Sequence, residues 1–257
     1  MLTQNLILDF SHIYPEGIEA DSKEVCRVNM SDIEGTNLYC SKEAEEEIRK
    51  RLKEKGPNGI HFIDNGNYHY MTKFFVEKIR RPFSLILFDY HSDMQEPMIK
   101  ELTSCGSWVR EIIEKNQNLV QLILIGPDQK SIDEIEPELK EKLICISIQE
   151  LEKQQGMEKA EEIRTELPAY FSIDKDVLDR YSARTNWNQG SMSIEVLEYL
   201  LSEFFCHMEI IGVDICGECD VMENIREKEK DCQINMVANQ NLYRFISSYI
   251  RKTSDNK

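Results

Sequence analysis

Short apolar runs alternate with amphipathic stretches along most of the chain. Apolar runs of a few residues, bounded by polar or turn-forming residues, are typical of buried strands. They predict strands at residues 5–10, 25–30, 59–64, 84–89, 119–126, 142–147, 169–174 and 208–216.

Stretches with the helical period of apolar positions lie between these runs. They predict helices at residues 41–55, 70–79, 108–115, 131–143, 151–167, 193–205 and 234–250. In the first of these, Ser41 is a suitable N-cap, acidic residues precede basic ones as the helix dipole favours, and Gly56-Pro57 ends the helix. Strands separated by helices of this length predict an α/β fold, a three-layer αβα sandwich whose mostly parallel, doubly wound sheet has about eight strands.

Length and composition limit the number of domains. The 257 residues suit one large domain better than two small ones. Because no linker, repeat or composition break is evident, we expect a single domain at residues 1–250 and a disordered tail at 251–257. No apolar stretch approaches the roughly 18 residues of a membrane helix, and the N-terminus lacks the features of a signal peptide. We therefore expect no membrane partner.

Charge and cysteine usage exclude further classes. The net charge of -16 disfavours nucleic acid as a partner, because phosphate backbones are polyanions. Eight cysteines without a regular framework suit a reducing compartment, so we expect a cytoplasmic protein. Cys216 and Cys219 form a lone CxxC, which is more often a pair of loop thiols than half of a zinc site.

Candidate metal ligands follow three of the predicted strands: His69, Asp89, His91, Asp93, Asp174 and Asp176. Alternate residues of an extended chain point to one face, so the D-x-H-x-D and D-x-D patterns each project their side chains together. Taken singly, such residues are more often caps or loop residues. Together they cost several kcal/mol to bury unless a cation compensates them. Four carboxylates and two imidazoles suit two ions, with Mn²⁺ favoured and Fe²⁺, Co²⁺ or Zn²⁺ as alternatives.

These segments resemble the metal-binding signatures of the arginase and agmatinase family, the ureohydrolases. The family motifs G-G-D-H, D-A-H-x-D and S-x-D-x-D-x-x-D correspond here to GNYH at 66–69, DYHSD at 89–93 and SIDKDVLD at 172–179. Order, spacing and all six ligand types are retained, and the resemblance covers roughly residues 59–218. The chain is thereby identified as a divergent member of that family.

The resemblance implies one centre with two metal ions. Asp89 and Asp174 would bridge the ions, His69 and Asp93 would complete one ion's site, and His91 and Asp176 would complete the other's. A hydroxide between the metals would attack the sp² carbon of a small amidine or guanidino substrate and cleave a non-peptide C–N bond. Asp93 would also orient that hydroxide. The leaving amine would then need a proton.

Two catalytic features of the family are altered. Cys105 stands where the family has a proton-shuttle histidine, a position that also resembles the S-S-G turn of formimidoylglutamases. In the stretch GVDICGE, Gly217 takes the place of the family's substrate-binding glutamate, and Glu218 follows one residue later. Either a bulge brings Glu218 into that role or the substrate is not a guanidinium.

Other candidate substrate contacts are Gln95, which falls where the family contacts an α-carboxylate, and Asn186 and Trp187, in the loop after the D-x-D segment. Trp187 either floors the pocket or anchors its loop. The leading function is an arginase-like hydrolase. The alternatives are a deacetylase-like amidohydrolase with a single zinc and a non-catalytic binder of guanidino compounds. Family members are often trimers or hexamers, which leaves a homo-oligomer open.

Overall fold

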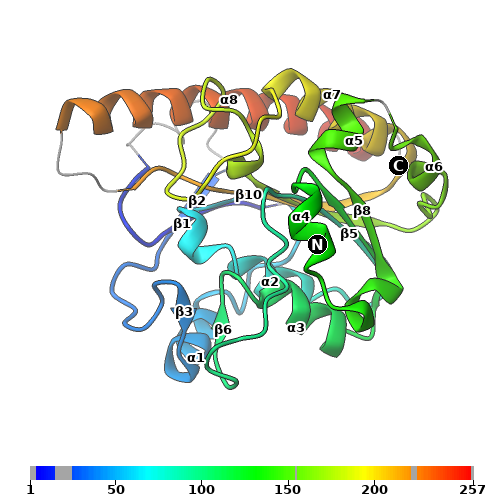
Figure 1. Cartoon of the computed structure of the whole chain (residues 1–257). Coiled ribbons are helices and arrows are strands. Elements are labelled where there is room, and N and C mark those ends of the chain that lie inside the picture. The colour runs from blue at the N-terminus through cyan, green and yellow to red at the C-terminus, as the bar shows by residue number, and fades with distance from the viewer. Residues whose placement is uncertain (1–3, 15–24, 154, 221–224, 256–257) are drawn as a thin grey trace.

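The structure, a computed structural model, describes residues 4–14, 25–153, 155–220 and 225–255. Eight parallel strands form one open sheet in the order β2-β1-β4-β10-β9-β5-β7-β8 (Figure 1). Their bounds are β1 Asn5–Asp9, β2 Val25–Asn29, β4 Ile60–Ile63, β5 Phe83–Phe88, β7 Leu119–Ile125, β8 Leu143–Ile146, β9 Ala169–Asp174 and β10 Ile210–Cys216. The fold class and the eight predicted strands are confirmed.

Eight α-helices lie in the described part of the chain: α1 Lys42–Arg51, α2 Met71–Val76, α3 Trp108–Lys115, α4 Gln129–Asp133, α5 Ile148–Glu152, α6 Met157–Glu161, α7 Ile194–His207 and α8 Ile225–Asp255. Short 3₁₀ helices are η2 Gly66–Tyr68, η3 Pro137–Lys142 and η4 Lys175–Val177. Two two-residue strands that the sequence did not predict, β3 Tyr39–Cys40 and β6 Thr103–Ser104, pair antiparallel outside the main sheet.

The sheet is covered on both faces. Successive side chains of β5 enter different cores: Leu85 and Leu87 pack with residues of α1, α2 and α3, whereas Ile86 and Phe88 pack with residues of α7 and α8. Figure 1 shows α7 and α8 on one side of the sheet and α1 to α3 on the other. Because both faces are buried, the central strands are apolar without alternation, which is why they were recognisable in the sequence.

Two predicted helices are wrong in extent. The predicted helix 131–143 is a short α4 followed by the 3₁₀ helix η3, which begins at Pro137. Proline lacks the amide hydrogen that a continuous helix needs at that position. The predicted helix 151–167 is instead two short helices. The first is α5, which begins at Ile148 after the N-cap Ser147, with a capping box of Ser147 and Glu150, and the second is α6, which follows Gly156.

The last helix is longer than predicted. Helix α8 begins at Ile225 and continues through Asp255, so the predicted tail at 251–257 overlaps its end. Residues 256 and 257 lie outside the described residues. Within the ranges given above, no helix is both long and apolar enough to cross a membrane.

One buried histidine on β4 makes the fold sensitive to acid. His61 is fully buried, stacks on Phe75 with ring centroids 4.0 Å apart, and places Nδ1 3.1 Å from the hydroxyl of Tyr170. Burial lowers the pKa of His61 to about 3. Since the unfolded chain binds this proton near pH 6.5 and the folded chain does not, the stability that neutral His61 allows is complete above pH 6.5 and is lost as the pH falls toward 3.

We therefore expect His61→Gln to reduce the loss of folding free energy between pH 7 and pH 4 by on the order of 3 kcal/mol relative to wild type. Urea unfolding at a series of pH values, with a chelator present, measures this difference. His207→Gln, which removes an exposed histidine at the end of α7, is the control and should follow the wild type. Parallel pH profiles of wild type and His61→Gln would contradict the expectation.

Candidate metal centre

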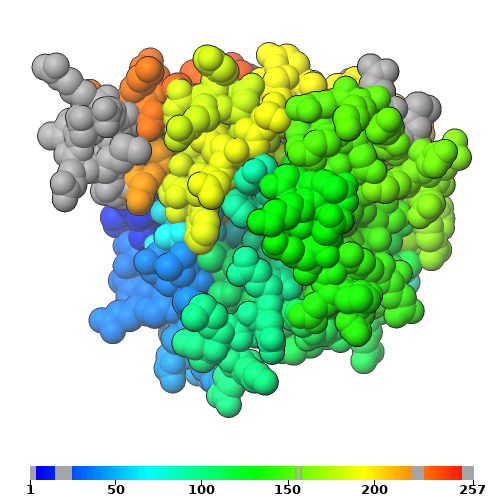
Figure 2. Space-filling view, in the orientation of Figure 1, coloured from blue at the N-terminus to red at the C-terminus, as the bar shows by residue number. Residues whose placement is uncertain are grey.

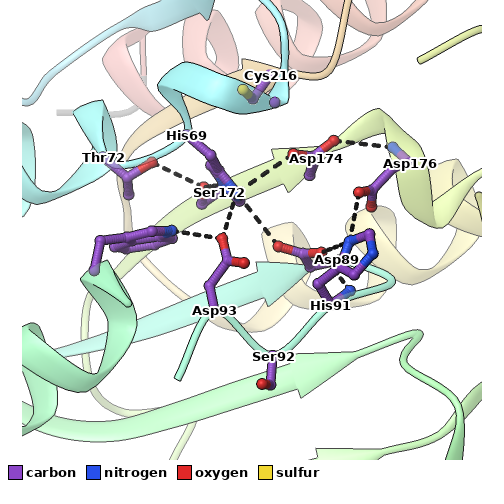
Figure 3. Close-up of polar contacts among 12 residues, drawn as sticks. His69, Thr72, Asp89, His91, Ser92, Asp93, Ser172, Asp174, Asp176 and Cys216 are labelled. Atoms are coloured by element: carbon purple, nitrogen blue, oxygen red, sulfur yellow. Dashed lines mark hydrogen bonds and ion pairs between the residues drawn. The ribbon is translucent and has the colours of Figure 1, made fainter. Parts of the chain in front are cut away.

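The six candidate ligands meet at the carboxyl edge of the sheet. Asp89 follows β5 and Asp174 ends β9, and these two strands are neighbours. His69 comes from the loop after β4, two strands away, and reaches the site beyond the end of β10. Figure 3 shows the imidazoles and carboxylates pointing toward one another from these elements.

The first ligand group is centred on His69. Its Nδ1 lies 3.0 Å from Asp93 Oδ2, 3.3 Å from Asp89 Oδ2 and 3.4 Å from Asp174 Oδ2. Ligand atoms of His69, Asp89 and Asp174 all lie within 4.8 Å of one another, and all three residues are buried. These three residues could hold a divalent cation.

The second ligand group is centred on His91. Its Nδ1 lies 2.8 Å from Asp176 Oδ2 and 3.7 Å from Asp89 Oδ1. Asp89 is thus common to both groups, with one carboxylate oxygen toward each imidazole. Asp174, the other expected bridge, belongs to the first group only, and its Oδ1 accepts a hydrogen bond from the Asp176 amide at 3.0 Å.

Each carboxylate has one oxygen held by a protein donor. Asp89 Oδ1 accepts from the amide of His91, Asp176 Oδ1 from the amide of Tyr90, and Asp174 Oδ1 from the amide of Asp176. The other oxygens of these three residues face the imidazoles. The backbone therefore orients the carboxylates and leaves one oxygen of each toward the centre.

The centre has an excess of negative charge. Burial, together with the charges of Asp176 and Asp93, raises the pKa of Asp89 well above its usual range. Burial and the charge of Asp176 raise the pKa of Asp174 to about 7. Burial lowers the pKa of His91, but the hydrogen bond and charge of Asp176 outweigh it and raise that pKa to about 10. All these shifts show that the site favours positive charge.

Two buried polar atoms without hydrogen-bond partners in the described part of the chain indicate whether a metal ion fits the site. His69 Nδ1 and Asp89 Oδ2 are buried, and neither has a hydrogen-bond partner among the described residues. Buried polar atoms of this kind are normally satisfied. They lie 3.3 Å apart and belong to the first ligand group. A cation between them would satisfy both atoms, so the residues present fit a metal.

A relay behind His69 fixes its tautomer. Ser172 donates a hydrogen bond to Asp214 Oδ1 at 2.6 Å, so its oxygen is free to accept from His69 Nε2 at 2.9 Å and from Thr72. The proton of a neutral His69 is therefore on Nε2, and the Nδ1 lone pair faces the carboxylates. Sequence analysis missed Asp214 and Thr72, although the S-x-D spacing places Ser172 on the same face of β9 as Asp174.

A residue of α3, Trp108, orients the side chain of Asp93. The indole Nε1 of Trp108 donates to Asp93 Oδ2 at 2.7 Å, and the Trp108 ring lies 5.0 Å from that of His69. Asp93 has a φ of 53°, a left-handed conformation that aspartate tolerates better than most residues. The contact of Trp108 had no signal in the sequence, because it depends on how α3 packs beneath the loop.

A pocket of about 180 Å³ opens over the ligands. Apart from four carboxylates and His91, it is lined by uncharged residues: Leu38, Tyr39, Gly66, Gln95, Ser104, Cys105, Gly106 and Trp187. In Figure 2, residues from distant parts of the chain surround the hollowed centre of this face. Two of the predicted substrate contacts, Gln95 and Trp187, thus lie at the pocket.

The loop that carries Trp187 lines the pocket and is also hydrogen-bonded to the turn before His69. Trp187 Nε1 and Asn186 Nδ2 both donate to Asn67 Oδ1, at 2.9 and 2.8 Å, and Asn186 Oδ1 accepts from the amide of Gly66. A Cβ on Gly66 would come within 2.6 Å of the Trp187 ring, so this contact requires glycine. Asn186 thus ties the loop to the turn that carries His69.

Cys105 lines the pocket but does not suit a proton shuttle. Burial, and to a lesser degree the charge of Asp93, raises the pKa of Cys105 to about 12. A thiol with that pKa neither gives up nor returns a proton readily near neutral pH. The raised pKa disfavours a proton shuttle at this position, and the catalytic role of Cys105 stays a prediction.

Glu218 is directed away from the pocket, contrary to the expected substrate contact. It is buried, and its Oε1 accepts from Lys175 Nζ at 2.5 Å and from Asn239 Nδ2 at 2.7 Å. Glu218 is not among the pocket-lining residues. A carboxylate already paired with a buried lysine has no free charge for a substrate, so the expected bulge does not give Glu218 that role.

The two cysteines of the CxxC contact different parts of the chain, and Cys216 is the last residue of β10 rather than the loop residue that was expected. Cys216 Sγ lies 3.3 Å from the carbonyl oxygen of Asn65, whereas Cys219 Sγ lies 3.5 Å from Cys232 Sγ on α8. Neither cysteine belongs to a metal-ligand group of the described residues.

Known proteins resemble this chain in sequence and in fold. An uncharacterized protein of Thermotoga maritima is 34% identical over 227 residues, which cover 87% of this chain and 84% of that protein. A hypothetical agmatinase from Burkholderia thailandensis has a similar structure, with a TM-score of 0.69 at 13% identity, covering 99% of this chain and 88% of the other. Formiminoglutamase from Trypanosoma cruzi, solved with Mn²⁺, gives a TM-score of 0.62 at 12% identity, covering 95% and 93%.

At these identities the solved structures show the fold alone. The sequence profile of the arginase family, however, matches residues 17–219, which is more than three quarters of the chain. The chain belongs to the arginase family.

Proposed function

We propose that this protein is a two-metal hydrolase that cleaves a non-peptide C–N bond in a small linear amidine or guanidino compound. The observation that carries the proposal is that Asp89 belongs to two ligand groups at the base of one pocket. One carboxylate between two sites is how paired-metal hydrolases hold their ions. The Mn²⁺ bound by the related formiminoglutamase supports manganese, with Fe²⁺, Co²⁺ or Zn²⁺ as alternatives.

Residues of this chain would bind the metal ions and orient the water and the substrate. His69, Asp89, Asp174 and Asp176 would hold the metals with His91, and the bound pair would supply activated water near neutral pH. Asp93, held by Trp108, would add a carboxylate beside His69 that can orient water or take up a proton. Gln95 and Trp187 would contact the substrate, and Asn186 would hold the loop of Trp187 in place.

The pocket favours a small substrate. Its volume is about 180 Å³, and its residues other than the proposed ligands are uncharged. Glu218, the one extra carboxylate that the sequence suggested, is paired with Lys175. We therefore propose that the reacting amidine or guanidino group is bound by the metal centre and by neutral polar groups such as Gln95, without a separate acidic residue.

Metal content is the first test. After purification with Mn²⁺ and desalting, elemental analysis should find about two ions per chain. Asp89→Asn changes a ligand of both groups and should lose both ions, whereas His91→Asn changes one group only and should retain one. His207→Asn, which alters an exposed histidine, is the control. Two ions in Asp89→Asn would contradict the proposed ligands, and one ion in the wild type would favour the deacetylase-like alternative.

Activity is the second test. The Mn²⁺-loaded protein is incubated with a panel of small guanidino, amidino and formimino compounds, and release of urea, ammonia or formamide is measured. We expect turnover of at least one compound, and its reduction to background in Asp89→Asn. Binding of a panel compound without any turnover would instead identify a non-catalytic binder.

The relay behind His69 gives a third test. Ser172→Ala removes the acceptor of His69 Nε2 and the donor to Asp214, so the imidazole loses the contact that fixes its tautomer. Loss of such a contact typically weakens metal binding by roughly 10- to 100-fold. Mn²⁺ titration should show this loss, and Ser202→Ala on the surface of α7 should not. Equal affinity in Ser172→Ala and wild type would show that the relay does not act on the metal.

A further inference from the structure

A buried lysine stands between two of the proposed ligands. Lys175 separates Asp174 from Asp176, and its side chain is fully buried. Its Nζ lies 2.5 Å from Glu218 Oε1 and 2.9 Å from Asn239 Oδ1, and Asn239 Nδ2 donates to the same Glu218 oxygen at 2.7 Å. The three side chains form a closed triangle, which we call the Lys175 cluster.

The Lys175 cluster joins three elements that are far apart in the sequence. Lys175 begins η4, Glu218 lies just after β10, and Asn239 belongs to α8. Asp174 and Asp176 line the pocket, whereas the intervening Lys175 does not and is bonded to α8 instead. The segment that carries both carboxylates is therefore held on the side away from the pocket, by the contacts of the Lys175 ammonium group with Glu218 and Asn239.

Burial of this ion pair is difficult to explain by stability alone. Taking both charges out of water costs several kcal/mol, and well-packed apolar residues of similar size are often as stabilising. An ion pair with a third hydrogen-bonding partner does, however, have a more restricted geometry than apolar contacts. Such a restriction has a use here, because the residues on both sides of Lys175 are proposed metal ligands.

Gly217 allows the close approach on which the cluster depends. Its φ is 91°, and a Cβ at this position would lie 2.4 Å from Asp174 Oδ1 and 2.9 Å from the amide nitrogen of Lys175. The end of β10 thus contacts the backbone of the ligand segment directly. Glu218, the next residue, is brought against Lys175 as a consequence.

We propose that Lys175, Glu218 and Asn239 are positioning residues that set Asp174 and Asp176 for metal binding, and that this is the use of Glu218 in this chain. The inference rests on the proposed metal centre. Positioning predicts that loss of the Lys175 cluster weakens metal binding. A purely electrostatic effect predicts the opposite for Lys175→Met, since removal of a positive charge near the site would favour cations.

The test is a Mn²⁺ titration of the full-length protein, with free Mn²⁺ measured by electron paramagnetic resonance. We expect Lys175→Met and Glu218→Gln each to bind Mn²⁺ roughly 10- to 100-fold more weakly than wild type, the range seen when contacts that orient ligands are removed. Asn239→Ala keeps the ion pair and should give a smaller loss of several-fold. Circular dichroism establishes that each variant is folded at the temperature of the titration.

Lys73→Met is the matched control. Lys73 is also a buried lysine, with Nζ 2.7 Å from Glu45 Oε1 and 3.0 Å from Glu111 Oε1, but these partners lie on α1 and α3. Its removal should lower the melting temperature and leave the affinity for Mn²⁺ unchanged. A merely structural role of Lys175 would give the same result as this control.

The outcomes separate the two proposals. A wild type that binds no Mn²⁺ would overturn the metal centre and the inference with it. Normal wild-type binding with unchanged affinity in Lys175→Met and Glu218→Gln, or tighter binding in Lys175→Met, would overturn the Lys175 cluster alone. If those two variants do not fold, Asn239→Ala decides, because unchanged affinity in that variant would also overturn the inference.

Discussion

The repulsion among four buried carboxylates is the constraint on which the site depends. Asp89, Asp93, Asp174 and Asp176 are each at most 9% exposed and lie at the edge of a single sheet. Backbone amides, an indole N–H and two imidazoles offset part of their charge. The remaining excess is visible in the raised pKa values of Asp89 and Asp174. Two divalent cations would balance this charge. The surrounding contacts hold the carboxylates close together despite their mutual repulsion.

Much of this architecture could be predicted from the sequence. Strands buried on both faces are rich in apolar residues, which is why the central strands were recognisable, and the half-buried edge strand β2 also lies where it was predicted. Ligands bind beyond the carboxyl ends of parallel strands. This rule predicted that the candidate ligands meet at one edge of the sheet, since the alternating residues Asp89, His91 and Asp93, and Asp174 and Asp176, stand where strands end. Helix bounds were less predictable, because Pro137 and Gly156 divide stretches whose apolar periodicity alone continues.

The contacts around the ligands could not be predicted in the same way. Trp108 reaches Asp93, and Asp214 reaches His69 through Ser172, across elements whose packing no local pattern encodes. Glu218 shows the limit most clearly. Its position was one residue from that of a substrate-binding glutamate, but the direction of its side chain depends on the left-handed backbone at Gly217 and on the buried amine of Lys175. The family motifs therefore predicted which residues meet at the centre, whereas they did not predict the direction of the Glu218 side chain.

The order of the strands in the sheet affects when the ligands come together during folding. His69 follows β4, yet its carboxylate neighbours follow β5 and β9, with β10 lying between β4 and β9 in the sheet. The donors of the first ligand group span more than a hundred residues, so they meet only after several long-range strand pairings have formed, which are slow steps in folding. We therefore expect the centre to form late in folding. Metal would be captured by an assembled sheet, and its binding energy would then favour the completed fold over partly folded intermediates.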